Sequence, residues 1–250
     1  MHAIREFPVS REIIGSMPVW VNQAADPLLP AVRVETADGF EWRFREESSR
    51  ALAIAKVVRM ASGLNGALVL TDSGLVTEAG VLLRAISDLS TEVIAVLEGD
   101  TRGEPTRAQR DFVRQFFDRD ATGTLADGAP RRFVGRDELL KAHDRLAEKV
   151  GFAGQTASNL KRAINFGLDG YVHGSYASAM ELYHGGRHEF MMSGHEGLDD
   201  LPIYRVSLAL ATHEALIVVG LMALALADMR LKGQIDVALD ALARSGEQDL

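Results

Sequence analysis

Residues 215–227 read ALIVVGLMALALA, a run of thirteen apolar residues that constrains the fold more than any other segment. A helix that crosses a membrane needs about 20 apolar residues. This run is shorter, because Glu214 precedes it and Asp228 follows it. We therefore expect a helix that is buried inside a helical bundle or in the seam between two copies, and a chain that stays out of membranes.

Composition limits the classes of protein to which the chain can belong. The 250 residues suffice for one large domain, and 47% of them are hydrophobic, which is enough for a sizeable core. The absence of cysteine excludes disulfides, thiolate zinc sites and a cysteine nucleophile. It also suits a reducing compartment, and residues 1–11 lack the apolar run of a signal peptide, so we expect a cytoplasmic protein.

Charge is unevenly distributed along the chain. The net charge of −8 combines −5 over residues 1–101, +4 over residues 102–162 and −7 over residues 163–250. Acidic ends disfavour a general nucleic-acid-binding protein. The basic middle segment is compatible either with a local patch for an anionic partner or with the solvated face of charged helices.

Residues 1–45 differ from the rest of the chain, since they hold four of the seven prolines and both tryptophans. Within them, residues 32–36 and 40–44 alternate apolar and polar side chains on either side of an Ala-Asp-Gly turn. This pattern predicts a β-hairpin over residues 32–44. An isolated hairpin is marginal in water, so we expect it to pack on helices.

Helical periodicity dominates residues 46–250, which we interpret as one helical-bundle domain behind an N-terminal extension. Strands do not alternate with helices and no phosphate-binding glycine loop occurs, so a Rossmann or barrel fold is not expected. The predicted class is all-α, a helical bundle with a small N-terminal β-hairpin. The expected helices cover residues 46–63, 75–97, 105–120, 136–150, 157–183, 202–228 and 232–243.

One face of the expected helix 157–183 carries a polar stripe that ends at His173. Asp169 lies four residues before His173, so its carboxylate can orient or charge the imidazole, as an acid–base pair requires. The alternative is a surface ion pair on a wet face. Arg162 and Phe166 share this stripe, and Gly170 and Gly174 flank His173. The opposite side is expected to face the core with Leu160, Ile164, Leu168, Tyr171 and Leu182.

A second set of charged residues, Arg84, Asp88 and Glu92, recurs every four residues on one helix face. This spacing favours a solvent-exposed ladder of ion pairs. The alternative is a site between this face and the His173 stripe, with Arg84 and His173 within about 8 Å so that both reach one phosphate group. The apolar residues of the helix are expected on its other side, at Leu75, Ala79, Leu82, Ile86, Leu89 and Val93.

The segment 81–88 with Glu92 after it, followed far downstream by Tyr-Val-His-Gly-Ser at 171–175, resembles bacterial helical proteins of the HEPN-like kind. The resemblance covers about residues 46–228. It implies a dimeric bundle that binds nucleotides or cleaves RNA without a metal, in a toxin or defence system. It implies His173 as the acid–base, Asp169 as its orienter and Arg84 as the phosphate contact. The family's arginine four to six residues before the histidine is absent, because residues 167–169 are Gly-Leu-Asp.

Histidines also gather after this helix, at His184, His188 and His195, with Glu181, Glu189 and Glu196 nearby. Imidazole and carboxylate groups can bind zinc or another divalent ion, and a metal-dependent hydrolase is therefore a further alternative. No known metal-binding spacing matches these residues, and we expect neither a metal nor a cofactor.

His213 and Glu214 lie in the most apolar helix. We expect His213 to be a hydrogen-bonded structural residue, and Glu214 to need an arginine from another helix if it is buried. Ser175 lacks the surroundings of a nucleophilic serine. The favoured interpretation is a HEPN-like, homodimeric bundle with RNA or a nucleotide as its partner. The alternative is a non-enzymatic bundle that binds a partner protein or regulates one.

Overall fold

The computed structural model describes residues 7–28, 30–36, 39–117, 134–149, 156–175, 180, 182–184, 187–193 and 202–247. The expected end of a helix near residue 120 lies outside these residues.

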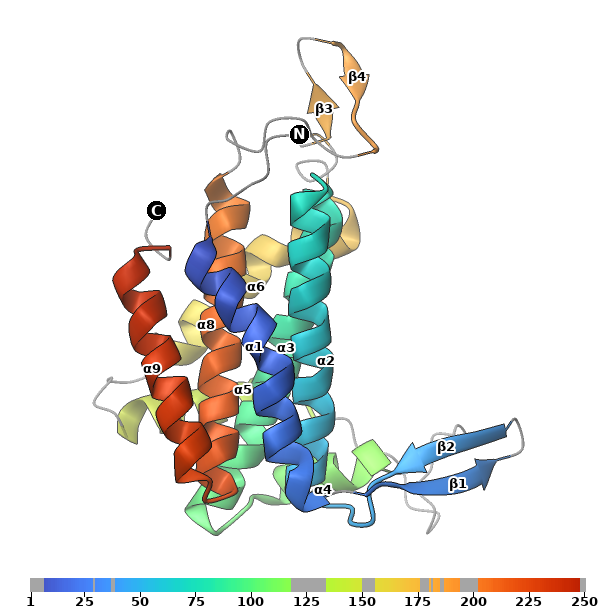
Figure 1. The fold of residues 1–250 in the computed structure, drawn as a ribbon, viewed down its shortest axis with the longest axis vertical. Helices are drawn as coiled ribbons and strands as arrows, with labels where there is room; N and C mark the ends of the chain where they lie inside the picture. Colours follow the sequence, from blue (N-terminus) through green and yellow to red (C-terminus); the bar gives the residue numbers. More distant parts are fainter. Residues whose placement is uncertain are drawn as a thin grey trace.

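The described chain is an all-α bundle with a small N-terminal hairpin, which confirms the predicted class. The third helix is its centre, since it packs on helices from both sides of the bundle. Figure 1 shows long antiparallel helices in front and shorter helices behind them and at one end. The helices are α1 (Pro8–Ala25), α2 (Ser49–Asp72), α3 (Val76–Arg102), α4 (Arg107–Phe117), α5 (Arg136–Lys149), α6 (Thr156–His173), α8 (Pro202–Ala225) and α9 (Met229–Ser245).

Helix α8 contains most of the apolar run and is a core helix of the bundle, as the sequence predicts. Leu208, Leu216, Val219 and Met222 are buried against α2, α3 and α9. Two segments, Ser49–Asp72 and Ser207–Ala225, are long and apolar enough to cross a membrane by length and composition. In the second, 61% of the most apolar window is buried inside the bundle, against 39% in the first.

Helix α1 was not predicted from the sequence. Its Ile13, Met17 and Val21 are buried in the same core as α2 and α8. Its first turn is capped by Glu247 at the far end of the chain, whose carboxylate accepts hydrogen bonds from the backbone N–H groups of Val9 and Ser10 at 2.9 and 3.0 Å. A cap supplied from 237 or 238 residues away leaves no local signal in the sequence.

Helix α2 continues to Asp72, so the prediction that it ends at Gly63 is wrong. Gly63 faces α3, where a Cβ atom would lie 3.1 Å from the side chain of Ile86. Gly66 faces α3 in the same way, 3.1 Å from Leu82. These glycines allow two long helices to pack closely, and tertiary contact outweighs their weak helix propensity.

Helix α6 ends at His173, which makes the predicted continuation to residue 183 wrong. Gly174 adopts a left-handed backbone with φ +60°, and the N–H of Ser175 donates to the carbonyl of Gly170 at 2.9 Å. This is the hydrogen bond of a Schellman motif, which closes a helix. Beyond it, β3 (Tyr183–His184) and β4 (Glu189–Phe190) pair as a short antiparallel hairpin that the sequence analysis did not predict.

The predicted N-terminal hairpin forms from β1 (Val32–Thr36) and β2 (Gly39–Arg43), with Val34 opposite Glu41. It extends sideways from the end of the bundle near α4 (Figure 1). We expected the hairpin to pack on the helices, but its two largest side chains are exposed to solvent. Phe40 is 52% exposed and Trp42 is 64% exposed.

Candidate functional site

Arg84 of α3 meets Asp169 of α6, although 85 residues separate them in the chain. The Arg84 Nε atom donates to Oδ1 of Asp169 at 2.5 Å, and the same guanidinium pairs with Asp88 one turn along α3. Arg84 is buried, and Glu92 turns to Lys56 of α2 instead of continuing the ladder. The predicted ion pair between Arg84 and Asp88 therefore forms, but the prediction that the ladder is solvent-exposed and continues to Glu92 is wrong. Arg84 lies against the helix that carries His173.

The charged form of Arg84 is stabilised by its carboxylate partners. Burial disfavours the charged guanidinium, but hydrogen bonds and charge interactions with Asp88 and Asp169 outweigh burial and raise the pKa of Arg84. Arg136 of α5 lies 3.6 Å from the same Asp88 carboxylate. Helices α3, α5 and α6 thus meet around alternating cations and carboxylates, and an incoming phosphate would have to replace a carboxylate on Arg84.

His173 occupies the last position of α6 and is exposed. In the described part of the chain it makes no hydrogen bond or ion pair with Arg84 or Asp169, and Asp169 pairs with Arg84 instead. A Cβ atom at Gly170 would lie 2.9 Å from the Oγ atom of Ser175, so the chain itself occupies the space beside this glycine. The distance between Arg84 and His173 stays a prediction.

Close contact between α3 and α6 depends on Gly80. A Cβ at Gly80 would lie 2.6 Å from the ring of Tyr171, so only glycine lets this ring lie on α3. Gly80 is one turn before Arg84, and Tyr171 is two residues after Asp169. The glycine therefore brings the two helices together at the point where Arg84 and Asp169 pair.

The buried side of α6 is polar, which the sequence analysis missed. Lys161 is 4% exposed and Asn165 is 1% exposed, while Leu160, predicted to face the core, is 62% exposed. Ser87 of α3 donates to the Asn165 side-chain oxygen at 2.5 Å. Three buried polar residues at helical spacing define this stripe, namely Ser158, Lys161 and Asn165, and Leu168, which was predicted to face the core, continues it. Their three-to-four-residue spacing was the signal in the sequence that could have revealed them.

Glu214 of α8 has the cationic partner that its burial requires, but the partner is Lys161 and not the arginine expected. Ser90 of α3 also donates to the Glu214 carboxylate. Burial lowers the pKa of Lys161, and the charge and hydrogen bond of Glu214 oppose that shift. The neighbouring His213 has a lowered pKa as well, chiefly because it is partly buried. The three helices α3, α6 and α8 therefore share one interior ion pair.

His143 of α5 borders this interior cluster. Burial and then the charge of Lys161 lower the pKa of His143 to about 4, against an ordinary value of 6.5. The imidazole is hydrogen-bonded to the backbone of Thr91, while its buried Nε2 atom has no hydrogen-bond partner. His143 is consequently neutral at physiological pH.

Glu98 extends the polar side of α3 toward its end. Its carboxylate accepts hydrogen bonds from Arg145 at 3.0 and 2.8 Å and from Gln109 at 3.0 Å. Burial would raise the pKa of Glu98, but these bonds and the nearby arginine charges lower it overall. The buried polar residues of α3 lie along one side of the helix, namely Arg84, Ser87, Ser90, Thr91 and Glu98.

The histidine segment after α6 places His188 in the exposed turn of the β3–β4 hairpin, with φ +55°. His195, Glu181 and Glu196 lie outside the described residues, as do the side chains of His184 and Glu189. Among the described side chains, no group of three or more histidines and carboxylates could hold a metal ion.

Purified protein is expected to carry no stoichiometric metal, because these histidines follow no known ligand spacing. Plasma emission spectrometry of the full chain, after dialysis against metal-free buffer, measures this directly. One tightly held divalent ion per chain would contradict the expectation, and its loss in His184→Ala or His195→Ala would assign the ligands.

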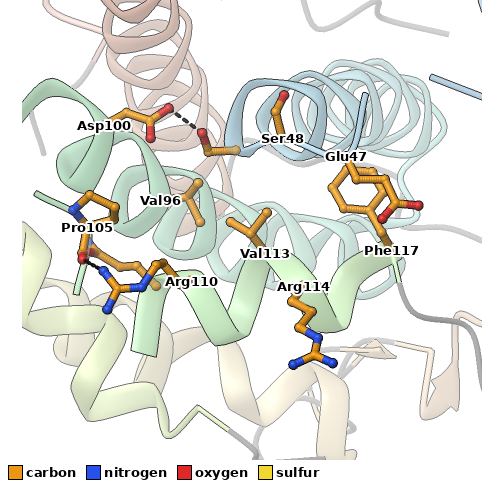
Figure 2. A pocket seen from close by; sticks show the side chains of 11 residues that line it. Glu47, Ser48, Val96, Asp100, Pro105, Arg110, Val113, Arg114 and Phe117 are labelled. Atoms are coloured by element: carbon orange, nitrogen blue, oxygen red, sulfur yellow. Dashed lines mark hydrogen bonds between the residues drawn. The ribbon is translucent and has the colours of Figure 1, made fainter. Parts of the chain in front are cut away.

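A pocket of about 410 Å³ lies between the start of α2, the end of α3 and α4. Figure 2 shows its apolar wall of Val96, Val113 and Phe117. Ser49, which also lines the pocket, donates a hydrogen bond to Asp100. Arg110, at its edge, donates to the carbonyl of Pro105. The pocket offers contact area for a small molecule, but its polar groups form no pair that resembles a general acid and base.

The seam between α3 and α6 is thus the candidate site, with Arg84 and Asp169 in contact and His173 at the exposed end of the same helix. The chemistry available there is anion binding by a positioned guanidinium and proton transfer by an imidazole. In comparisons with protein-family models, with curated proteins and with solved structures, this chain finds no match.

Proposed function

We propose that this chain is a HEPN-like bundle that binds RNA or a nucleotide at the α3–α6 seam and cleaves RNA without a metal. The observation that carries the proposal is the 2.5 Å pair between Arg84 and Asp169, which sets a buried cation beside the helix that ends at His173. A cation for the phosphate and an imidazole for proton transfer are the two groups that such a cleavage requires.

Each residue has a separate role in this proposal. Arg84 binds the phosphate, and Asp169 positions the guanidinium. The side chain of Asp88 is half exposed, so it can leave Arg84 for water when a phosphate arrives. His173 is free to take a proton from the attacking hydroxyl, since no described carboxylate holds it. Arg136, which lies near Asp88 of α3, and Arg162, which pairs with Asp137 of α5, are partly exposed and can attract the nucleic-acid backbone.

His173→Ala is expected to lower the rate of RNA cleavage about 10²–10⁴-fold, because it removes the group that transfers the proton. Cleavage of a fluorophore-labelled single-stranded RNA gives the rate, and circular dichroism verifies that helix content is unchanged. His188→Ala, which removes another exposed histidine, serves as the matched control and should retain full activity. Equal rates in the two variants would overturn the role of His173.

A second candidate is a non-enzymatic bundle that binds or regulates a partner protein. One observation favours it: among the described residues of α3, α5 and α6, Arg84, Arg136 and Arg162 each pair with a carboxylate. Such pairs also serve a purely structural role. A folded wild-type protein that neither cleaves RNA nor binds a nucleotide in equilibrium titrations would replace the first proposal with this one.

We also propose a cytoplasmic location without a membrane anchor. The support is the burial of α8 inside the bundle. Fractionation of expressing cells tests this, since recovery of the chain in washed membranes would contradict it.

A further inference from the structure

The β1–β2 hairpin has an exposed aromatic face. Phe40 and Trp42 of β2 lie edge to face, with ring centres 6.2 Å apart, and Arg33 of β1 lies 4.2 Å from the centre of the Phe40 ring. Within the described chain the only strand paired with β1 is β2. A two-stranded hairpin is marginal in water, and an unpaired edge is a template for another strand. The hairpin therefore has the form of a docking element.

The charges on β1 indicate what docks there. Arg33 and Glu35, the residues before and after Val34, lie on the same face of the strand. Within one chain they form an ion pair at 3.0 Å. In a two-fold dimer the same surface of each copy meets the other. An antiparallel β1–β1 pair centred on Val34 places Arg33 of each copy opposite Glu35 of the other. The strand is thus complementary in charge to a second copy of itself.

We propose that the β1 edge binds the β1 edge of a second copy, with Val34 on the two-fold axis, to form a four-stranded sheet. Arg33 is the β1 neighbour of Trp42, and Glu35 is the neighbour of Phe40. Across the joined sheet, Trp42 and Arg33 of one copy therefore lie beside Glu35 and Phe40 of the other. Each such row has two opposite charges in the middle and an aromatic ring at each end. The β2 edge does not allow the same arrangement, because pairing centred on Glu41 would set two identical carboxylates opposite each other. This inference is independent of the proposed RNA chemistry.

The experiment uses the full chain and measures mass by sedimentation velocity over a range of concentrations. Wild type is expected to be a dimer. Arg33→Glu and Glu35→Arg should each raise the dimer Kd at least about tenfold, which corresponds to about 1.4 kcal/mol, because both cross-copy pairs become like-charge pairs. Arg43→Glu and Glu41→Arg make the same charge changes on the opposite face of the hairpin and should leave the Kd unchanged.

Mixing the two single variants tests directly whether Arg33 and Glu35 pair across the two copies. Arg33→Glu presents two carboxylates and Glu35→Arg presents two guanidinium groups, so the mixture should form a heterodimer with an affinity near that of wild type. The double variant R33E/E35R should recover the homodimer. Recovery on mixing also shows that the single variants are folded.

A wild-type chain that stays monomeric throughout the micromolar range would overturn the proposal. So would single variants that remain dimeric, since another surface would then join the copies. Loss of RNA binding in Arg33→Glu, with wild type monomeric, would assign the aromatic face to nucleic acid instead.

Discussion

Glu214→Leu is expected to lower the free energy of unfolding by about 3–5 kcal/mol, because it leaves the Lys161 ammonium group buried without its carboxylate. Lys161 is 4% exposed, so water cannot replace the lost partner. Ser90 loses an acceptor at the same time. Urea denaturation, followed by circular dichroism, measures the change. Arg162→Ala, which removes a neighbouring cation from the exposed side of α6, is the control and should cost much less.

Two further measurements separate the ion pair from simple loss of packing. The double variant K161M/E214L should recover most of the stability, because replacing both members of a buried pair by apolar side chains leaves no unpaired charge. The stability of Glu214→Leu should also rise with pH. Burial lowers the pKa of Lys161 below its ordinary value of 10.5. As the pH rises toward 10.5, the unfolded chain therefore binds more protons than the folded chain, and the folded state gains stability. A single variant as stable as the double variant would contradict the role assigned to the pair.

Acidification from pH 6.5 to pH 4 is expected to cost the fold about 3 kcal/mol through His143 alone. The pKa of His143 is about 4 in the folded protein and 6.5 when unfolded, chiefly because the imidazole is buried. Between these values the unfolded state binds the proton and the folded state does not, so stability falls as the pH falls. Each pKa unit corresponds to about 1.4 kcal/mol.

His143→Leu tests this directly, since leucine has a similar volume and no proton to bind. The variant should show a flatter dependence of stability on pH between 6.5 and 4, measured by urea denaturation at each pH. His188→Gln removes an exposed histidine and should keep the wild-type slope. Glu98 affects stability over a different pH range. Because its pKa is lowered in the folded protein, it stabilises the fold above about pH 4.5, and this contribution is lost as the pH falls further. Parallel curves for wild type and His143→Leu would exclude His143 as the cause.

The candidate site was only partly predictable from the sequence. Charge spacing identified Arg84 and Asp169, and the structure pairs them. The same spacing wrongly placed Arg84 in solvent, because one helix face cannot show whether a second helix covers it. The buried Lys161 and Asn165 were missed for a related reason. Polar residues at helical spacing indicate solvent unless another helix supplies partners, and these partners come from α3 and α8, far away in the chain.

The sequence by itself determined the all-α class, the N-terminal hairpin and the burial of the apolar run in α8, since all three follow from local periodicity and composition. Only the tertiary structure decided where some helices begin and end. Helix α2 passes through Gly63 because α3 packs against it, and α1 begins where Glu247 from the other end of the chain caps it. The tertiary structure also decided which polar residues are buried, because burying a charge is favourable only when a distant residue pairs with it.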